Sequence, residues 1–339
     1  MKARQTRSPG GSAVEKAKTY SSRPRVMEMQ KQQGISVILP AYNAEMFISH
    51  AINSILSQSL LPSEIIIVND CSRDDTVRLI RKKYRHVSFL KVVHQKDNLG
   101  LGAARNRGIL ESTGQFLAFI DADDVWLPDK LSKQMELFAR AGNEYGLCHT
   151  FYETIDENGE LLRSWEIERT GTPFVINGNS LTPGALAGGN FVAGSGSSVL
   201  IRRECIEAIG MFDEDRSIVE DWLLWYKISL RFKILTLPLV LVRIRDHAYG
   251  MHKNFSWVYQ KNINTVSQML TLAPPEHRGI LEQRRLAFAA SLCLRSLPNF
   301  KICNALLKKY GLNLLSAMLK KIIRHISLRL TSSKRACKL

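Results

Sequence analysis

The hydrophobic and polar positions divide the chain into three parts. Residues 1–34 hold few large apolar side chains and much Lys, Arg, Ser, Gly and Gln, which predicts a disordered basic segment. In residues 35–255, short β-branched runs alternate with stretches in which apolar residues recur at helical spacing. Residues 256–339 become helical in pattern and basic. We therefore expect one α/β domain between two basic ends.

Strands and helices alternate through the first half of this domain. Four short apolar runs are predicted to be buried strands, and three stretches with helical spacing to be helices. The strands are 35–40, 64–70, 89–95 and 115–121, and the helices are 44–57, 74–84 and 101–112. Such alternation is typical of a parallel sheet, which binds ligands beyond the carboxyl ends of its strands. The polar residues that directly follow the strands are therefore candidates for a binding site.

The second half of the domain has a less regular pattern. It predicts a helix over 125–138, a loop-rich region over 164–196 and a strand at 197–203. Two further helices are predicted at 203–210 and 220–232. Because loops often carry binding residues, we expect the loop-rich region to help select the substrates.

The net charge of +16 lies at the two ends of the chain. Residues 1–34 hold eight Lys/Arg and two Glu, and residues 276–339 hold fourteen Lys/Arg and two Glu, so the remainder is close to neutral. Within 304–330, apolar residues recur at helical spacing with Lys pairs on other faces; they are Leu315, Met318, Leu319, Ile322, Ile323 and Ile326. Two interpretations stay open: a helix lying on an anionic membrane surface, or a helix packed on the domain with solvated lysines.

Several features that would indicate other classes of protein are missing from the sequence. No run of about 18 apolar residues is present, and the N-terminus lacks the apolar core of a secretory signal. The six Cys are scattered without a CxxC pair, which favours reduced thiols. The basic end has neither a nucleic-acid-binding motif nor interleaved aromatics. We expect a cytoplasmic protein, with peripheral binding to the inner face of the membrane as a hypothesis, and no nucleic-acid partner.

Three aspartates follow the strand in FLAFIDADDVWLP, residues 116–128. Asp121, Asp123 and Asp124 repel one another, so such a cluster needs a compensating charge. A hard divalent cation, Mg²⁺ or Mn²⁺, together with a diphosphate would supply it. The alternative is structural, because Asp123 or Asp124 would also suit the N-cap of the helix predicted to follow.

A second motif is ambiguous in a different way. Gly100 and Gly102 lie after a strand and before a helix, which resembles a dinucleotide-binding fingerprint. However, Arg105 occupies the third glycine position, and the motif follows the third strand rather than the first. A nicotinamide-dependent oxidoreductase is therefore disfavoured, and the other interpretation is a turn whose Arg105 and Asn106 face a ligand or a loop.

Two candidates lie late in the domain. Glu220 and Asp221 either begin a helix, where acids suit the dipole, or bring a carboxylate to a hydroxyl that must lose its proton. His247 is either an ordinary surface or core histidine or a metal ligand. The residues alone leave both choices open.

The ordered set of motifs resembles glycosyltransferase family 2 over roughly Ile35 to Met251. The segments are SVILPAYNAEMFISHAINSILSQS, EIIIVNDCSRDDT, NLGLGAARNRGI, GQFLAFIDADDVWLPDKLSKQ and GMFDEDRSIVEDWLLW. The resemblance implies an inverting, nucleotide-sugar-dependent enzyme with the GT-A fold, a Rossmann-like, mainly parallel sheet flanked by helices. It places the catalytic domain at 35–255 and a basic helical C-terminal extension at 256–339.

The resemblance also implies roles for individual residues. The nucleotide and its sugar would contact Pro40, Ala41, Tyr42, Asn43, Asp70, Asn98, Gly100, Arg105 and Asp121. The Asp-x-Asp pair Asp121 and Asp123 would hold ribose and the metal–diphosphate, with His247 as a loosely matched third metal ligand. Asp221 would be the catalytic base, beside Glu220. The usual Asp-Asp-Gly-Ser is changed here to Asn-Asp-Cys-Ser at 69–72.

The implied reaction transfers one sugar from a nucleoside-diphosphate sugar, with UDP-sugar expected. The acceptor would be a hydroxyl of a saccharide or lipid-linked saccharide in cell-envelope or surface polysaccharide synthesis, with Mn²⁺ or Mg²⁺ as cofactor. The Gln-x-x-Arg-Trp sequence of processive relatives is missing, which favours single transfer. The alternative is a catalytically silent nucleotide-sugar or membrane-binding module, although the retained Asp121, Asp123 and Asp221 argue against it.

Overall fold

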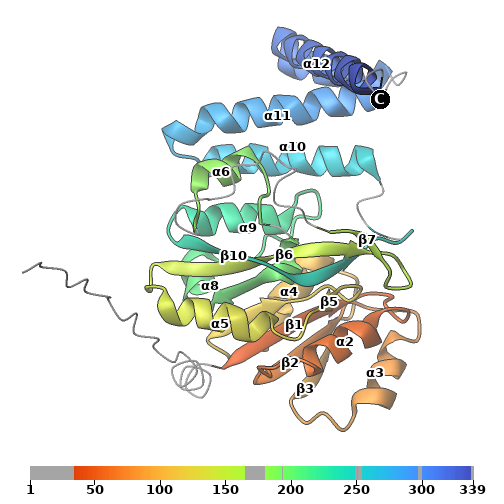
Figure 1. Cartoon of the computed structure of the whole chain (residues 1–339), viewed down its shortest axis with the longest axis vertical. Helices are drawn as coiled ribbons and strands as arrows, with labels where there is room; N and C mark the ends of the chain where they lie inside the picture. Colours follow the sequence, from red (N-terminus) through yellow and green to blue (C-terminus); the bar gives the residue numbers. More distant parts are fainter. Residues whose placement is uncertain are drawn as a thin grey trace, which may run out of the picture.

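The computed structural model describes residues 34–164, 180–192, 194–248, 250, 254–296 and 300–336. A twisted central sheet forms the lower and middle part of the molecule, with helices on both faces, and α10, α11 and α12 are stacked above it (Figure 1). The segment predicted to be disordered, 1–34, lies outside the described residues except for Gly34.

The described strands join into one ten-stranded sheet of order β3-β2-β1-β4-β9-β6-β10-β5, with β7 beside β6 and β8 beside β10. The strands are β1 (Ile35–Ala41), β2 (Glu64–Asn69), β3 (Leu90–His94), β4 (Phe116–Phe119), β5 (Val125–Trp126), β6 (Tyr145–Ile155), β7 (Leu161–Arg163), β8 (Ser180–Leu181), β9 (Val199–Arg202) and β10 (Lys233–Arg245). The pairs among β3, β2, β1 and β4 are parallel, as the alternating pattern predicts.

The helices cover both faces of this sheet. They are α2 (Ile48–Leu56), α3 (Thr76–Tyr84), α4 (Leu101–Leu110), α5 (Lys130–Arg140), α6 (Pro183–Gly188), α7 (Ser195–Ser198), α8 (Arg203–Ile209), α9 (Glu220–Ser229), α10 (Phe255–Leu272), α11 (Pro275–Arg295) and α12 (Phe300–Ala336). Alternate residues of β1 point to opposite faces: Val37 and Leu39 pack in the core under α2, α3 and α5, whereas Ile38 packs toward α4, α8 and α9. The sheet is thus buried on both faces, which explains its continuous apolar strands.

The second half of the sheet is mixed rather than parallel. Strand β9 runs antiparallel to both β4 and β6, while β6 and β10 are parallel to each other. The sequence pattern assigned neither β6 nor β10. Strand β10 contains Pro238, and its register with β6 shifts between Leu237 and Val240, so the bulge interrupts the alternation. Strand β6 buries the polar His149, whose Nε2 lies 2.9 Å from Thr236 Oγ1.

The predicted helix over 125–138 is wrong at its start. Val125 and Trp126 form the short strand β5, which pairs with β10, and α5 begins only at Lys130. The predicted helices at 203–210 and 220–232 are confirmed as α8 and α9. Of the region expected to be loop-rich, residues 165–179 and 193 lie outside the described part, and the rest holds β8, α6 and the start of α7.

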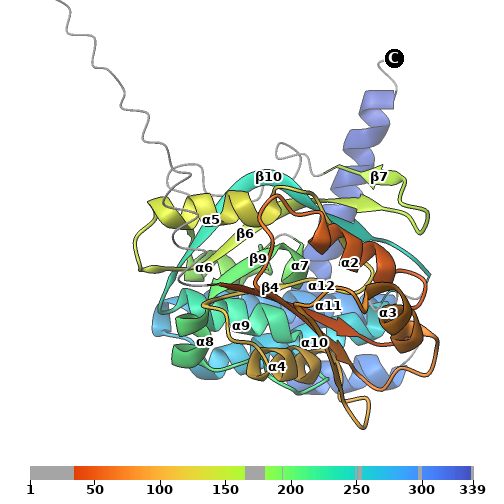
Figure 2. The same ribbon diagram turned by 90° about the horizontal axis from the view of Figure 1, so that it is seen from below.

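The C-terminal helices pack on the sheet domain in layers. Helix α10 contacts α9, α11 contacts α6 and α10, and α12 contacts α11 (Figures 1 and 2). Val266, Met269 and Leu281 belong to the same buried cluster as the core residues of α9, so α10 and α11 are continuous with the domain core. Helix α12 is broken at Gly311, whose φ of 56° lies in the left-handed region that glycine tolerates.

Helix α12 has features of both interpretations of the basic end, a helix packed on the domain and a helix with an exposed apolar face. Leu306 and Leu314 are buried against α11, which corresponds to the packed helix. Several other apolar side chains beyond the kink are exposed, namely Leu312, Leu315, Leu319, Ile322 and Ile323. The predicted face also included Ile326, whose side chain lies outside the described part. None of the described helices combines the length and apolarity that crossing a bilayer requires.

Candidate active site

A cavity of about 810 Å³ opens at the carboxyl ends of β1, β2 and β4. This is the edge at which a parallel sheet binds ligands, and the volume suits a nucleotide-sized molecule. Most of the predicted site residues line it: Pro40, Ala41, Tyr42, Asn43, Asp70, Asn98, Gly100, Asp121, Asp123, Glu220 and His247. Arg105 and Asp221 are not among the lining residues.

The loops after β1 and β2 hold each other in place along one wall, which we call the strand-loop wall (residues 40–47, 69–76 and 95–102). Asn43 lies at a φ of 48°, its backbone N–H donates to Ser72 Oγ at 3.1 Å, and its Oδ1 accepts from Arg73 N at 2.9 Å. Cys71 lies at a φ of 65°, which explains why the family pattern has glycine at this position. The exchange to cysteine keeps the turn at the cost of backbone strain.

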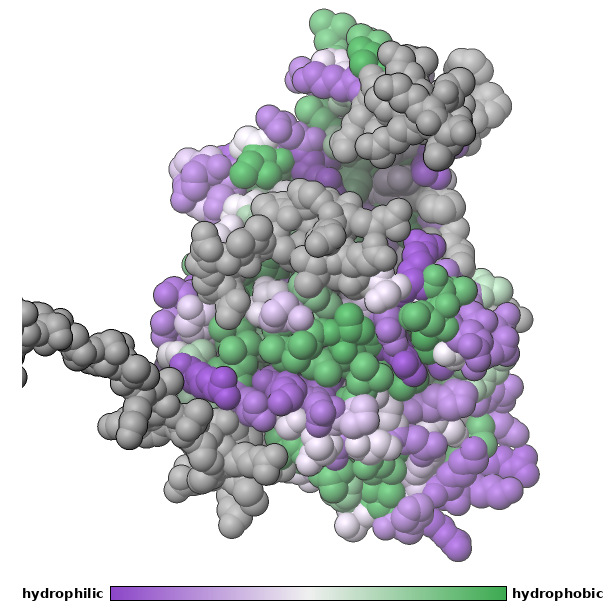
Figure 3. Space-filling model, in the orientation of Figure 1, coloured by the Kyte–Doolittle hydropathy of each residue, from purple (hydrophilic) through white to green (hydrophobic). Residues whose placement is uncertain are grey.

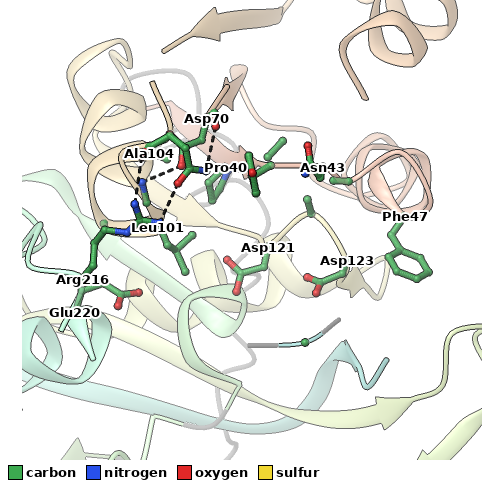
Figure 4. A pocket seen from close by; sticks show the side chains of 18 of the residues that line it. Pro40, Asn43, Phe47, Asp70, Leu101, Ala104, Asp121, Asp123, Arg216 and Glu220 are labelled. Carbon is green, nitrogen blue, oxygen red and sulfur yellow. Dashed lines mark hydrogen bonds between the residues drawn. The ribbon is translucent and has the colours of Figure 1, made fainter. Parts of the chain in front are cut away.

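Asp70 shapes the same wall from within. Its side chain is buried, with Oδ1 accepting from Gln95 Nε2 at 2.7 Å and from Leu99 N at 2.8 Å. Its Oδ2 accepts from Gly100 N at 2.9 Å (Figure 4). Three donors therefore bind a carboxylate that was predicted to contact a nucleotide base, and the side chain fixes the path of the 95–100 loop.

The Gly-x-Gly motif serves this loop and the helix that follows. Gly100 lies at a φ of 95° at the start of α4, where a side chain would be strained. A Cβ added to Gly102 would lie 2.6 Å from the carbonyl oxygen of Asp213. Both glycines are thus required by chain geometry, which agrees with a turn rather than a dinucleotide fingerprint.

Arg105 lies beneath the opposite side of the cavity and joins two of its carboxylates. Its guanidinium is 1% exposed and donates to Asp121 Oδ1 and to Glu220 Oε1, each at 2.9 Å. Burial lowers the pKa of Arg105, but the charges of Asp121, Glu220 and Asp221 outweigh burial and leave this pKa raised. The side chain predicted to line the nucleotide side therefore acts here as a support for the carboxylates.

Asp123 and His247 lie together at the far end of the cavity. Asp123 Oδ2 is 3.0 Å from His247 Nε2, and the aspartate side chain keeps 37% of its surface exposed. Figure 4 shows Asp121 and Asp123 side by side, with their carboxylates directed into the open space. Desolvation and the negative charge of Asp121 raise the pKa of Asp123, against the hydrogen bond from His247.

The third aspartate turns away from the cavity. Asp124 is buried, its Oδ2 accepts from Ser197 Oγ at 2.5 Å, and its Oδ1 accepts from Arg245 N at 3.1 Å. Burial and the neighbouring aspartates raise its pKa well above the ordinary value. The N-cap of α5 is Asp129, so the alternative in which Asp123 or Asp124 caps that helix is wrong.

The donor set around Asp123 suits a divalent cation only in part. Among the described residues, no group of three His, Cys, Asp or Glu side chains is arranged to hold a metal ion. Mg²⁺ and Mn²⁺ do not need such a cage, since they bind through one or two carboxylates and take their other ligands from substrate phosphates and water. The adjacent carboxylates of Asp121 and Asp123 fit that mode of binding.

Glu220 and Asp221 occupy the first turn of α9, so the helix-start interpretation holds and does not exclude the other. Glu220 lines the cavity and is tied to Arg105, and burial raises its pKa against the opposing charge of Arg105. Asp221 is 5% exposed and lies 3.5 Å from Asn190 Nδ2 through its Oδ1. The two acids thus face different neighbours.

Several lining residues were not predicted from the sequence, among them Arg216, Trp257 and Lys261. Arg216 donates to the backbone oxygen of Asn98 at 3.2 Å and to its Oδ1 at 2.9 Å, which closes the loop over α4. Trp257 and Lys261 reach the cavity from α10. No local motif marks Trp257 or Lys261, because the long-range packing of α10 on α9 brings them there. Arg216 lies within the quoted segment GMFDEDRSIVEDWLLW, but it was not singled out.

Proteins named as glycosyltransferases are similar to this chain in sequence. An uncharacterized glycosyltransferase of Rickettsia bellii (strain RML369-C) is 30% identical over 223 residues, which cover 66% of this chain but only 31% of that protein. The putative teichuronic acid biosynthesis glycosyltransferase TuaG of Bacillus subtilis (strain 168) is 40% identical over 128 residues, covering 38% of this chain and 50% of TuaG. The chain thus spans a third to a half of the length of these relatives.

Solved structures show the fold class as well. S. aureus TarS 1-349 in complex with UDP-GlcNAc matches with a TM-score of 0.58 and 21% identity, over 78% of this chain and 74% of that one. The mannosyltransferase PcManGT from Pyrobaculum calidifontis, in complex with GDP-Man and Mn²⁺, matches with a TM-score of 0.55 and 17% identity, over 89% and 94% of the two chains. These likenesses confirm the predicted GT-A fold.

The family assignment rests on the sequence itself. The model of glycosyl transferase family 2 matches residues 36–210, which is just over half of the 339 residues and includes the strand-loop wall and the aspartate cluster. This match overturns the oxidoreductase alternative. The chain belongs to glycosyltransferase family 2, and its fold is that of a sugar-transferring enzyme.

Proposed function

We propose that this chain is an inverting, metal-dependent transferase that moves one sugar from a nucleoside-diphosphate sugar to an acceptor hydroxyl. The observation that carries the proposal is the bridge from Asp121 through Arg105 to Glu220, because it places the aspartate cluster and the acidic start of α9 on one cavity. Donor and acceptor can then meet between them.

The donor nucleotide would lie along the strand-loop wall. Tyr42 is 47% exposed at the cavity and offers a flat aromatic surface, while Asn43 and Asn98 offer polar groups. The neighbouring Asp121 and Asp123 would face the diphosphate, where a bound Mn²⁺ or Mg²⁺ would offset the charge of the departing group. UDP is the expected nucleotide, because TarS binds UDP-GlcNAc, although PcManGT binds GDP-Man.

Asp221 does not line the cavity itself but follows the lining residue Glu220 in the first turn of α9. It would take the proton from the acceptor hydroxyl as the hydroxyl oxygen attacks the anomeric carbon. The new bond forms on the face opposite the nucleoside diphosphate, the bond to that diphosphate breaks, and the configuration is inverted. Glu220 is less suited to this role, because its Oε1 is held by the buried guanidinium of Arg105. Glu220 would instead hold the start of α9 next to the aspartate cluster, through its ion pair with Arg105.

The acceptor would be a saccharide or lipid-linked saccharide of the cell envelope or surface. TuaG is named for teichuronic acid biosynthesis and shares 40% identity over its aligned part, which supports this class of acceptor. The position of α12 also suits a lipid-linked acceptor. Hydrophobic residues lie beside hydrophilic ones over this helix at the top of the molecule (Figure 3). Leu319 and Ile323 on this helix are exposed, and Lys320 adjoins Leu319 in the sequence.

Donor binding tests the proposal against the silent-module alternative. Thermal unfolding would be followed with UDP-GlcNAc, UDP-glucose and GDP-mannose, each with and without Mn²⁺, because a ligand of the folded state raises apparent stability. We expect one donor to raise the melting temperature only with the metal, and the same donor to be slowly hydrolysed. Binding without hydrolysis or transfer would favour the silent module, and no binding of any donor would contradict both.

Membrane association is tested separately on the full chain. We expect co-sedimentation with vesicles that contain anionic lipid at low salt, and loss of binding in high salt because screening weakens surface charge. Leu319→Glu combined with Ile323→Glu should reduce binding, whereas Leu161→Glu, an exposed leucine on β7, should not. If wild type, the α12 double variant and Leu161→Glu bound the vesicles equally, α12 would not be the membrane-binding element.

A further inference from the structure

The first turns of α10 place an aromatic and a cationic side chain together on the cavity. Trp257 and Lys261 both line it, and they are one helical turn apart. The Lys261 ammonium lies 4.1 Å from the centroid of the Trp257 ring, and Trp257 is 40% exposed. A large exposed indole at a cavity is a surface ready for a ligand.

Lys261 is not ion-paired to any of the described residues, although the charges of Glu220, Asp221 and Asp215 reach its ammonium. Within the described part of the chain its side chain makes no hydrogen bond or ion pair, and its closest defined contact is the indole face. Burial lowers the pKa of Lys261, while the charges of Glu220 and Asp221 oppose this shift. An ammonium that is partly removed from water and unpaired gains from an anionic ligand more than a solvated one does.

The location of this pair assigns it to the acceptor rather than to the donor. Under the proposed function, the nucleotide would lie along the strand loops and the start of α4, and Asp121 and Asp123, which also line the cavity, would face the diphosphate. Helix α10 instead packs on α9, the helix whose first turn carries Glu220 and Asp221. Lys261 also senses the charge of Arg216, so this side of the cavity carries two cations near the candidate base, beside the lining residues Asp215 and Glu220.

We propose that Trp257 and Lys261 form an acceptor subsite, in which the indole carries the face of a sugar ring and the ammonium binds an anionic group of the acceptor. That group is a carboxylate or a phosphate, since both offer oxygens that accept charge-assisted hydrogen bonds from an ammonium. The inference rests on the proposed function and deepens it, because it limits the acceptor to a charged saccharide.

A merely structural role for Lys261 would change acceptor affinities in a different way from a binding role. If the ammonium only balanced the charge of Glu220 and Asp221, its loss would weaken neutral and charged acceptors alike. If it binds the acceptor, its loss would affect only the charged ones. The contrast between neutral and charged sugars therefore separates the two roles.

The test uses methyl glucoside, methyl glucuronoside and glucose 6-phosphate as probes, titrated by calorimetry into the full chain with the donor's nucleotide and Mn²⁺ present. For wild type we expect both anionic probes to bind about 10-fold tighter than the neutral one, which corresponds to about 1.4 kcal/mol. Lys261→Gln should remove this difference, and Lys261→Arg should largely keep it. Trp257→Ala should weaken all three probes, whereas Trp257→Phe should weaken them less.

Controls separate this inference from the proposed function. Lys308→Gln removes the same charge from an exposed position on α12 and should leave every affinity unchanged. A preference for only one anionic probe would distinguish a carboxylate from a phosphate. If a donor stabilises the protein but Lys261→Gln keeps the preference, or no probe binds wild type at millimolar concentration, the subsite is wrong. If no donor binds, the proposed function itself is wrong.

Discussion

The two walls of the cavity are built by different means. The strand-loop wall comes from three short loops within residues 40–102, and backbone groups make most of its hydrogen bonds, as at Asn43 and Asp70. The opposite wall takes Asp121 from the loop after β4, Glu220 from α9 and Lys261 from α10, which are remote in sequence. Here the buried guanidinium of Arg105, rather than a shared backbone, connects the parts.

Under the proposed function, the two walls would have different roles, one in donor recognition and the other in catalysis. Hydrogen bonds from backbone N–H groups to side-chain oxygens hold a wall rigidly, which suits recognition of a constant nucleotide. A wall joined by ion pairs concentrates charge where bonds are made and broken, which suits catalysis. Variants on the two walls should therefore fail in different ways, with lost turnover on one side and lost donor affinity on the other.

The largest effect is expected at the candidate base. Asp221→Asn removes the proton acceptor but keeps the size of the side chain, so transfer should fall by about 100-fold or more. The donor's effect on melting temperature should stay as in wild type, because Asp221 lies off the strand-loop wall. Initial rates of nucleoside-diphosphate release with acceptor present would measure the loss.

The neighbouring acid is the matched control for that experiment. Glu220→Gln keeps one hydrogen bond from Arg105 and should cost less turnover than Asp221→Asn. If Glu220→Gln lowered turnover more than Asp221→Asn, the base would be Glu220, and the role of Asp221 would be limited to the first turn of α9.

Arg105 is expected to show the second largest effect. Arg105→Met leaves the carboxylates of Asp121 and Glu220 without their buried partner, so the free energy of unfolding should drop by about 3 kcal/mol. Urea unfolding followed by circular dichroism would measure it. Arg107→Met on the same helix removes only an exposed pair with Glu111 and should change stability far less. Equal losses in both variants would contradict the central role of Arg105.

The sequence made the first wall far more predictable than the second. Strands β1 to β4 alternate with helices, and the polar residues after them lie where a parallel sheet binds ligands, so Asn43 and Asp70 were found from pattern and resemblance. Lys261 and Trp257 could not be found this way. Their place at the site depends on how α10 docks on α9, and no local pattern records that contact.

The parts of the fold that were not predicted from the sequence also depend on contacts between remote residues. Strands β6 and β10 pair with each other across about 90 residues, and a bulge beside Pro238 breaks the alternation that would mark β10. Arg105 was predicted from the family motif to line the nucleotide side, yet its partners Asp121 and Glu220 lie 16 and 115 residues away. Local patterns predict elements, whereas ion pairs of this kind become visible only in three dimensions.

On the strand-loop wall the expected effect is smaller and concerns donor binding. Asp70→Asn places amide hydrogens opposite the N–H groups of Leu99 or Gly100, which loses acceptors inside a buried loop. We expect a loss of about 1–2 kcal/mol in stability and a weaker donor-dependent rise in melting temperature, with turnover at saturating donor largely kept. Asp97→Asn, at an exposed position of the same loop, is the control. A variant that loses turnover at unchanged donor affinity would contradict the division between the walls.

The smallest effect concerns a second buried cation that lacks the partners of Arg105. Lys130 is fully buried on α5, where its Nζ donates to Gln134 Oε1 at 2.9 Å and lies 4.1 Å from the Trp126 ring centroid. Burial lowers the pKa of Lys130 to about 7, from 10.5 in an unfolded chain. The native state therefore releases this proton above about pH 7 while the unfolded state keeps it. Stability should rise with pH from that point, by at most about 1.4 kcal/mol per unit.

Lys130→Met tests this directly, because methionine fills a similar volume without the charge. Between pH 7 and 8.5, the wild-type free energy of unfolding should rise more steeply than that of the variant, because ionisation of the cysteine thiols contributes equally to both proteins. At pH 6 the variant should be the more stable of the two, because the native lysine is then charged in an apolar core. Lys133→Met, at a half-exposed position of the same helix, should follow the wild-type slope. If the free energy of unfolding changed with pH in the same way for wild type and Lys130→Met, Lys130 would keep its proton in the native state. Gln134 and Trp126 would then stabilise the charged lysine as well as the carboxylates stabilise Arg105, and the proposed difference between the two buried cations would be wrong.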